Sequence, residues 1–182
     1  SLFAIIFFFY KELFDLKNNQ KLLRLIVIGS IPLIIIGYIL YSTEVIHILR
    51  NIKIIAWSTL IFGIVLYIAD RSRFDKKISS NLNFKTICII GLFQILALIP
   101  GVSRAGITIT AARILRFNRF DSSKISFLLS IPALTGASLL SLKDLVIQNI
   151  EFSYLVFFAI AFSFLFSYFT VRFFLKYINK FS

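Results

Sequence analysis

The stretch ALIPGVSRAGITIT, residues 97–110, decides how this sequence folds. It interrupts an apolar region with Pro100 and Gly101, and it sets Arg104 among small and hydroxyl-bearing residues. Apolar runs of membrane-spanning length recur along the chain, which is 59% hydrophobic over 182 residues. An arginine deep in such surroundings costs roughly 2.5–3.5 kcal/mol on insertion scales. The stretch therefore indicates a broken helix that holds a functional charge.

The apolar runs predict an all-α integral membrane protein, a polytopic helical bundle, because lipid leaves no water to satisfy a non-helical backbone. We expect a single membrane domain over residues 1–182. Its opening residues, SLFAIIFFF, and the absence of methionine suggest a fragment that begins inside a span. The predicted elements are a half-span at 2–10, spans at 23–41, 54–69, 125–142 and 152–171, polar loops at 11–22, 42–53, 70–85, 116–124 and 143–151, and a basic tail at 172–180.

The region of about 86–117 has two interpretations, one continuous span or a re-entrant hairpin of two half-helices. The hairpin places sixteen lysines and arginines on one side of the membrane and three on the other, whereas the single span gives ten and nine. Cytoplasmic loops retain basic residues, so the charge distribution favours the hairpin. Each half-helix is also shorter than the roughly 20 residues that a span requires. Irregular backbone at membrane depth is typical of a binding site.

The net charge of +12 fits cytoplasmic loops better than nucleic-acid binding, and we expect no nucleic-acid partner. The one cysteine, Cys88, excludes an internal disulfide, and no His/Cys cluster for zinc is present. All eight acidic residues fall in or beside the predicted loops, and His47 falls in a loop as well. An acid, a base or a metal ligand for the site would therefore have to come from elsewhere.

The residues around Arg104 suit a phosphate-bearing ligand. A guanidinium is a planar donor that matches phosphate oxygens, and Ser103 adds a hydroxyl. Gly101 and Gly106 would let backbone amides approach the ligand, beside the positive end of the resuming helix. Two further polar residues, Thr108 and Gln94, have two open interpretations each: contact with the ligand or loop, or contact with a neighbouring helix.

The segments GLFQILALIPGVSRAGITITAARIL and DSSKISFLLSIPALTGAS resemble the undecaprenyl-diphosphate phosphatases of the bacitracin-resistance type. The family signature is Pro-Gly-x-Ser-Arg-Ser-Gly-x-Thr, preceded by Gln and followed by a Ser-Phe-Leu-Leu-x-x-Pro segment. The corresponding residues here begin at Pro100, with Gln94 upstream and Ser126 to Pro132 downstream. Ala105 departs from the pattern, because it replaces the second serine. The match is specific over 91–140 and looser elsewhere.

The resemblance implies an inverted repeat with two re-entrant hairpins, of which the first, acidic one would precede residue 1, and a further span after the chain's end. It implies hydrolysis of undecaprenyl diphosphate to undecaprenyl phosphate and phosphate, which recycles the lipid carrier for peptidoglycan. Arg104 and Ser103 would be catalytic, Ser103 as phosphate ligand or nucleophile, and Gly101, Gly106, Thr108 and Gln94 would bind substrate. A divalent cation, Mg²⁺ or Ca²⁺, would be held by carboxylates outside this chain, so the fragment alone would be inactive.

The expected partners are a polyprenyl diphosphate and membrane lipids, with a homo-oligomer left open. The expected location is the bacterial inner membrane, with the site facing the extracytoplasmic side. The main alternative is a lipid or anion transporter with a broken-helix phosphate site. A membrane phosphatase with two catalytic histidines conflicts with the single His47, and a purely structural subunit would leave Arg104 without a ligand.

Overall fold

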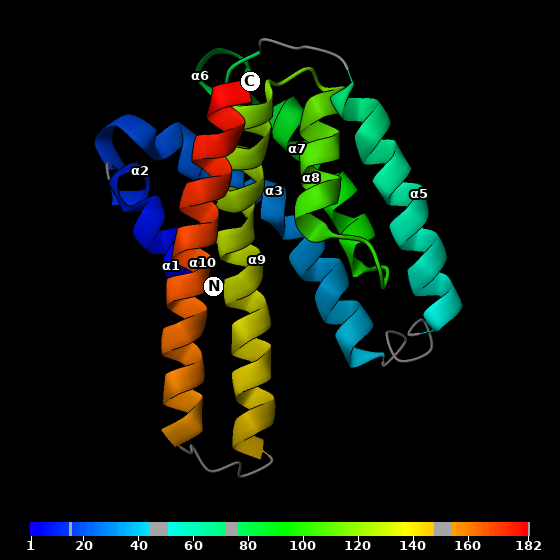
Figure 1. Ribbon diagram of the computed structural model, residues 1–182, viewed down its shortest axis with the longest axis vertical. Coiled ribbons are helices and arrows are strands. Elements are labelled where there is room, and N and C mark those ends of the chain that lie inside the picture. Colours follow the sequence, from blue (N-terminus) through cyan, green and yellow to red (C-terminus); the bar gives the residue numbers. More distant parts are fainter. Residues whose placement is uncertain (15, 44–50, 72–75, 148–153, 182) are drawn as a thin grey trace.

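The computed structural model describes residues 1–14, 16–43, 51–71, 76–147 and 154–181, so that His47 lies outside the described residues. Every regular element in these ranges is a helix, as the sequence predicts (Figure 1). The helices are α1 (Leu2–Phe8), α2 (Tyr10–Phe14), α3 (Leu16–Ser42), α5 (Ile52–Asp70), α6 (Ile78–Asn81), α7 (Phe84–Ile95), the 3-10 turn η1 (Leu96–Leu98), α8 (Arg104–Ile114), α9 (Arg119–Ile147) and α10 (Tyr154–Phe181).

Within the part of the chain that the structure describes, four helices are long and apolar enough to cross a membrane, which confirms the four predicted spans and a multi-pass membrane protein. They cover Asn19–Ser42, Ile52–Asp70, Arg119–Asp144 and Val156–Lys180. The apolar segment Phe84–Leu98 is shorter than these spans.

Three loop boundaries predicted from the sequence are wrong. Much of the expected loop 11–22 is helical, because α2 ends at Phe14 and α3 begins at Leu16. Helix α9 begins at Arg119, inside the expected loop 116–124, and continues to Ile147, inside the expected loop 143–151. The basic tail 172–180, to which the sequence assigned no structure, forms the last turns of α10. Apolar runs mark only the membrane-facing part of a helix, and a helix can continue with polar residues beyond it.

Helices α7 and α8 form an antiparallel hairpin within the bundle. Figure 1 shows both of their outer ends near α6 and the C-terminus, whereas the turn between them stops short of the level at which α9 and α10 end. The chain entering and the chain leaving the hairpin are paired, because the Asn118 amide donates to the Lys76 carbonyl at 3.1 Å and the Lys76 amide donates to the Arg116 carbonyl at 3.3 Å. The hairpin therefore begins and ends at the same end of the molecule.

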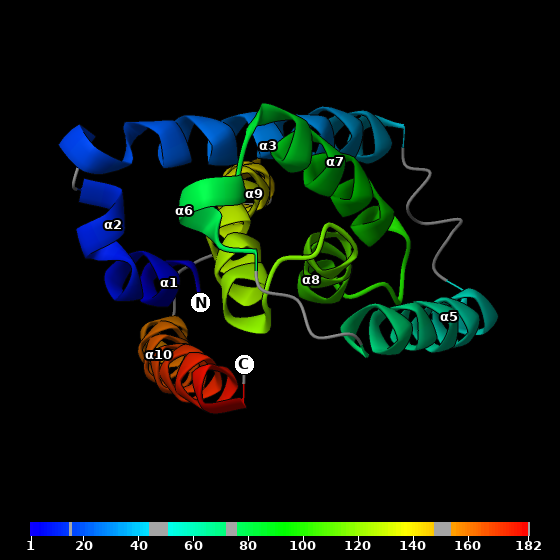
Figure 2. The ribbon, with the colours of Figure 1, turned by 90° about the horizontal axis from the view of Figure 1, so that it is seen from above.

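The core surrounds the outer part of this hairpin, where α3, α7, α8 and α9 meet (Figure 2). Its most buried members include Ile87 and Ile90 of α7, Ala112 of α8 and Leu129 of α9. Helices α3 and α7 approach most closely at Gly29 and Gly91, where a Cβ on Gly91 would lie 3.0 Å from the carbonyl carbon of Gly29. Small residues at such a contact let two membrane helices pack backbone to backbone.

The outer faces of α5 and α10 are apolar and exposed. Trp57 on α5 is 64% exposed and Phe166 on α10 is 70% exposed. Ser58 is the one residue of α5 that is buried among those described. Large apolar surfaces of this kind are stable only against lipid or a partner, which fits helices at the perimeter of a membrane protein.

Candidate active site

The break between α7 and α8 is a β-turn over residues 99–102. The Val102 amide donates to the Ile99 carbonyl at 3.1 Å, which closes the turn. Pro100 occupies the second position, and Gly101 the third with φ of +94°. A proline followed by a glycine with positive φ is the arrangement of a type II turn, which a residue with a side chain would strain. Pro100 and Gly101 therefore explain why the helix ends here.

The tip of the turn is packed against α5. The Ser58 hydroxyl donates to the Pro100 carbonyl at 2.6 Å, and the Thr59 hydroxyl donates to the Gly101 carbonyl at 2.9 Å. A Cβ on Gly101 would lie 2.6 Å from the Ile55 carbonyl oxygen, closer than real side chains approach. The close approach of α5 therefore requires a glycine at position 101, which the sequence interpretation did not foresee. The approach of a ligand to Gly101 stays a prediction.

Helix α8 begins immediately after the turn, and Ser103 caps it. The Gly106 amide donates to the Ser103 hydroxyl at 3.2 Å, and Ser103 has the extended backbone of an N-cap residue. The first amides of a helix have no acceptor inside the helix, so those of Arg104 and Ala105 need one from outside it. This end of α8 also carries the positive end of the helix dipole. The helix start expected from the sequence is present at Arg104, and its binding of an anion stays a prediction.

Arg104 projects from the first position of α8 toward α9. Its Nη1 donates to the Ser130 carbonyl at 3.3 Å, and the residue is half-buried. Within the described ranges, no carboxylate lies within ion-pair distance of it. A guanidinium has five N–H donors, and the bond to Ser130 occupies one of them. Arg104 therefore retains both its charge and most of its donors for an anionic partner.

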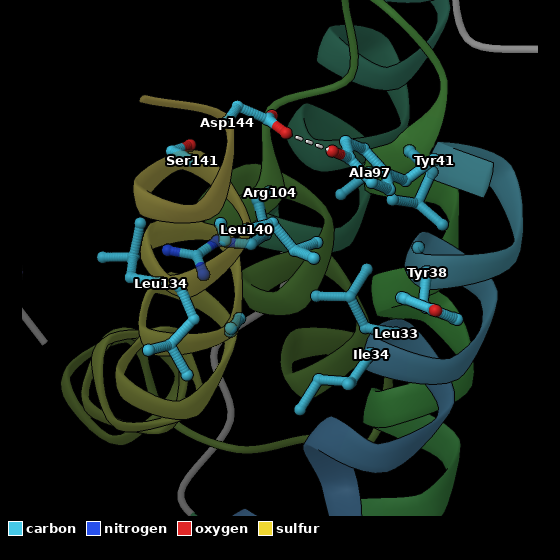
Figure 3. A pocket seen from close by; sticks show the side chains of 16 residues that line it. Leu33, Ile34, Tyr38, Tyr41, Ala97, Arg104, Leu134, Leu140, Ser141 and Asp144 are labelled. Atoms are coloured by element: carbon cyan, nitrogen blue, oxygen red, sulfur yellow. Dashed lines mark hydrogen bonds between the residues drawn. The ribbon is translucent and has the colours of Figure 1, made fainter. Parts of the chain in front are cut away.

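Arg104 lines a cavity of about 670 Å³ between α3, the end of the hairpin and α9 (Figure 3). Its walls are mainly apolar, with Leu33, Leu98 and Leu134 among the lining residues. The Tyr41 hydroxyl of α3 donates to an oxygen of Asp144 on α9 at 2.5 Å, and both residues also line the cavity. The sequence interpretation assigned Asp144 to a loop, which is wrong, since it lies in α9. A carboxylate and a guanidinium thus share one apolar cavity.

Thr108 lies one turn into α8 and is buried. Its hydroxyl donates to the Ser126 hydroxyl on α9 at 2.7 Å, and the carbonyls of Arg104 and Ala105 lie 3.0 Å from it. The sequence left two contacts open for Thr108, with the ligand or with a neighbouring helix, and the structure shows the second. Thr108 therefore ties the first turn of α8 to α9; its contact with substrate stays a prediction.

Gln94 lies at the end of α7 and is fully buried. Neither its amide nitrogen nor its amide oxygen has a hydrogen-bond partner among the described residues. A buried polar group left unpaired costs about 1–3 kcal/mol. Neither the loop nor a neighbouring helix supplies the contact considered from the sequence. The Gln94 amide is thus a buried polar group that has no hydrogen-bond partner among the described residues, and its contact with substrate stays a prediction.

A second buried arginine, Arg113, lies within the predicted hairpin of about 86–117, but the sequence interpretation did not single it out. It lies in the last turn of α8 with a side chain 2% exposed, and its Nε lies 2.9 Å from an oxygen of Asp70. Its Nη1 also donates to the Phe117 carbonyl at 2.9 Å. Arg119 pairs with Asp70 as well, at 2.9 Å. The burial of Arg113 could have been inferred from the two small residues before it, Ala111 and Ala112, because small residues indicate a closely packed helix face.

Comparison with known proteins identifies the family of the chain. A family model described as bacitracin resistance protein BacA matches residues 1–182. The undecaprenyl-diphosphatase of Pelagibacter ubique (strain HTCC1062) is 71% identical over 183 residues, which cover 100% of this chain and 72% of that protein. The undecaprenyl-diphosphatase of Elusimicrobium minutum (strain Pei191) is 38% identical over 189 residues, covering 99% of this chain and 71% of that protein. The chain, with its broken hairpin and its half-buried arginine, therefore belongs to the bacitracin resistance protein BacA family.

Proposed function

We propose that this protein hydrolyses undecaprenyl diphosphate to undecaprenyl phosphate and phosphate, which returns the lipid carrier to peptidoglycan synthesis. The observation that carries the proposal is Arg104, a guanidinium with no carboxylate partner within the described ranges, at a helix start and in an apolar cavity. Charge and helix amides suit a diphosphate, and apolar walls suit a prenyl chain. The relatives named undecaprenyl-diphosphatase support the same substrate.

In this reaction Arg104 would bind the diphosphate and stabilise the charge that develops on the transferred phosphoryl group. Catalysis of phosphoryl transfer rests mainly on positioning and on such electrostatic stabilisation. The amides of Arg104 and Ala105 would bind further phosphate oxygens at the start of α8. Because these donors are fixed by the helix, they need no reorganisation when the charge moves.

Ser103 is proposed as a phosphate ligand, with attack by its hydroxyl as the alternative. Its hydroxyl accepts the Gly106 amide and keeps a proton that it can donate to a phosphate oxygen. An attacking serine would instead need a base to take that proton. The cap that Ser103 already provides therefore supports the ligand role.

The remaining predicted binding residues lie in the turn, in the first turns of α8 and at the end of α7. Gly101 and Gly106 shape the backbone there, Thr108 holds the first turn against α9, and the buried amide of Gln94 has no partner among the described residues. We propose that Gln94 hydrogen-bonds to a group that completes the site.

The described residues do not by themselves form a site for a divalent cation. No group of three or more His, Cys, Asp or Glu side chains that could hold a metal occurs among them. Among the described residues that line the cavity, Asp144 is the one carboxylate, and it accepts a hydrogen bond from Tyr41. The cation implied by the resemblance therefore stays a prediction.

We further propose that the hairpin is re-entrant and that the site opens to the extracytoplasmic side of the bacterial inner membrane. The hairpin begins and ends beside Lys76 and Arg116, in the most basic part of the sequence. Basic loops stay in the cytoplasm, so the turn at Gly101 would point away from it. Phosphate would then be released outside.

The test is phosphate release from undecaprenyl diphosphate by the protein as its gene encodes it, purified in detergent. Arg104→Ala should lower kcat/KM by about 10³-fold, since an arginine at a phosphoryl transition state contributes on that scale. Arg172→Ala is the matched control, because Arg172 is exposed on α10. Full activity of Arg104→Ala would contradict the proposal. Phosphate flux through vesicles without hydrolysis would favour a transporter instead.

A further inference from the structure

We propose that Ser58 and Thr59 of α5 are positioning residues that hold the turn at Pro100 and Gly101, and through it the start of α8, in the geometry that the reaction needs. This inference rests on the proposed function. Neither residue belongs to the motif that carries Arg104, and more than forty positions separate the two segments in the sequence, since both bonds join residues 42 apart.

The two carbonyls at the tip of the turn explain why α5 must supply donors. The bond from Val102 to Ile99 closes the turn and leaves the carbonyls of Pro100 and Gly101 outside it. At membrane depth an unpaired carbonyl is strongly unfavourable, because no water replaces the missing partner. Ser58 and Thr59 are adjacent on α5, and each satisfies one of these carbonyls.

The two hydroxyls are the polar part of the contact between α5 and the turn, which also brings Ile55 against Gly101. Ser58 is buried, whereas Trp57 beside it is 64% exposed. The Ser58 hydroxyl lies 2.6 Å from the Pro100 carbonyl and 3.1 Å from the carbonyl of Ile55 in its own helix. A hydroxyl has one proton, so the shorter distance identifies the turn as the main acceptor. The Thr59 hydroxyl donates across to Gly101 at 2.9 Å.

Fixing both carbonyls fixes the planes of two successive peptide groups, because each peptide unit is rigid. Those planes lead directly into Ser103 and Arg104, which begin α8. Gly101 permits this arrangement, since any side chain there would overlap α5. A small rotation of the turn would displace the guanidinium and the helix amides together, and misplacement of about 1 Å can cost 10²-fold in rate.

The test compares Thr59→Val, which removes the hydroxyl at nearly constant shape, with Thr59→Ser, which keeps it. Thr59→Val should lower kcat about tenfold with KM changed by less than about twofold, because binding of the prenyl chain is untouched while alignment is lost. Thr59→Ser should retain wild-type kcat. Ser58→Ala should behave like Thr59→Val.

Two controls remove hydroxyls that donate within their own helix. Thr170→Val removes a bond to the Phe166 carbonyl on α10, and Ser30→Ala removes a buried bond to the Ile26 carbonyl on α3. Both should leave kcat unchanged. A second readout is hydrogen–deuterium exchange, in which the Val102 amide should exchange faster in Thr59→Val and Ser58→Ala than in wild type or the controls.

The outcomes separate this inference from the proposed function. If wild type hydrolyses the lipid and Arg104→Ala does not, wild-type kcat in Thr59→Val would overturn the positioning role alone. Equal losses in Thr59→Val and Thr59→Ser would overturn it too, because shape rather than the hydroxyl would then matter. If wild type fails to hydrolyse the lipid, the proposed function is wrong. The exchange measurement still tests the inference in that case, because an unchanged exchange rate of the Val102 amide in Thr59→Val and Ser58→Ala would show that α5 does not hold the turn.

Discussion

Two arginines at opposite ends of α8 illustrate how differently buried charges are used. Arg113 is fully buried, with Asp70 and a backbone carbonyl on its guanidinium. Arg104 is half-buried, and among the described residues it has no carboxylate. A buried charge that is already paired serves the fold, whereas one without a counter-charge indicates a ligand. The sequence alone distinguished Arg104 through the glycines and hydroxyls around it.

Removal of Arg113 should destabilise the protein far more than removal of Arg119, although both bind Asp70. Arg113→Ala deletes bonds to Asp70 and Phe117 and leaves a cavity, so we expect the free energy of unfolding to fall by about 3 kcal/mol. The Arg119 side chain is 41% exposed, and Arg119→Ala should cost less than about 1 kcal/mol. Unfolding by sodium dodecyl sulfate in detergent micelles measures the free energy of unfolding of each variant. Equal losses in Arg113→Ala and Arg119→Ala would contradict the greater structural role of Arg113.

At the same scale, Gly101 shows what could not be predicted from local sequence. The pair Pro100–Gly101 predicted a break in the helix, and the break is present. Its packing against Ser58 and Thr59 depends on a helix that is distant in the sequence. The sequence around these two hydroxyls does not indicate which carbonyls accept their hydrogen bonds. The same holds for Asp70 and Arg113, whose pairing appears only when α5 and α8 are placed side by side.

At the scale of elements, hydropathy and basic residues predicted the four spans and a hairpin with both ends on one side. Helix boundaries were less predictable, because the polar beginnings of α3 and α9 have the composition of loops. The hairpin's path is stabilised by the pairing of Lys76 with residues 116 and 118 and by a capping box at the start of α7, in which Asn83 and Thr86 exchange hydrogen bonds. Such caps define where a short helix begins.

The hairpin predicts a labelling pattern. In a Cys88→Ser background, Lys85→Cys and Arg116→Cys should react with a membrane-impermeant maleimide from the same face of sealed vesicles, because they lie near the paired ends of the hairpin. Lys143→Cys, near the end of the α9 span, should react from the opposite face. Inside-out and right-side-out vesicles together assign each position. Labelling of residues 85 and 116 from opposite faces would mean that the segment crosses the membrane.

At the scale of the whole molecule, the composition predicted a membrane protein, but not which helices pack together. Helix α1 packs against α10, where Phe7 lies edge-on to Phe164 and Tyr168 with ring centroids 6.2 and 5.7 Å apart. Nothing in either segment alone identifies its partner, since both are rich in phenylalanine. Long-range pairing of this kind depends on the shapes of whole helix surfaces rather than on local patterns.

The dependence on a divalent cation is a prediction for the whole protein. Treatment of the gene-encoded protein with EDTA should abolish phosphate release, and Mg²⁺ or Ca²⁺ should restore it, because a cation would neutralise the diphosphate beside Arg104. Full activity after exhaustive chelation would remove the cation from the reaction.

The glycine contact between α3 and α7 has a mechanical consequence. Because Gly29 and Gly91 bring the two backbones together, tilting α7 against α3 would press one backbone into the other, and we expect the two helices to move as one body. An alternating-access carrier would need a pivot elsewhere, outside this seam. A rigid contact between α3 and α7 suits an enzyme whose reacting groups stay fixed while the lipid substrate enters and leaves.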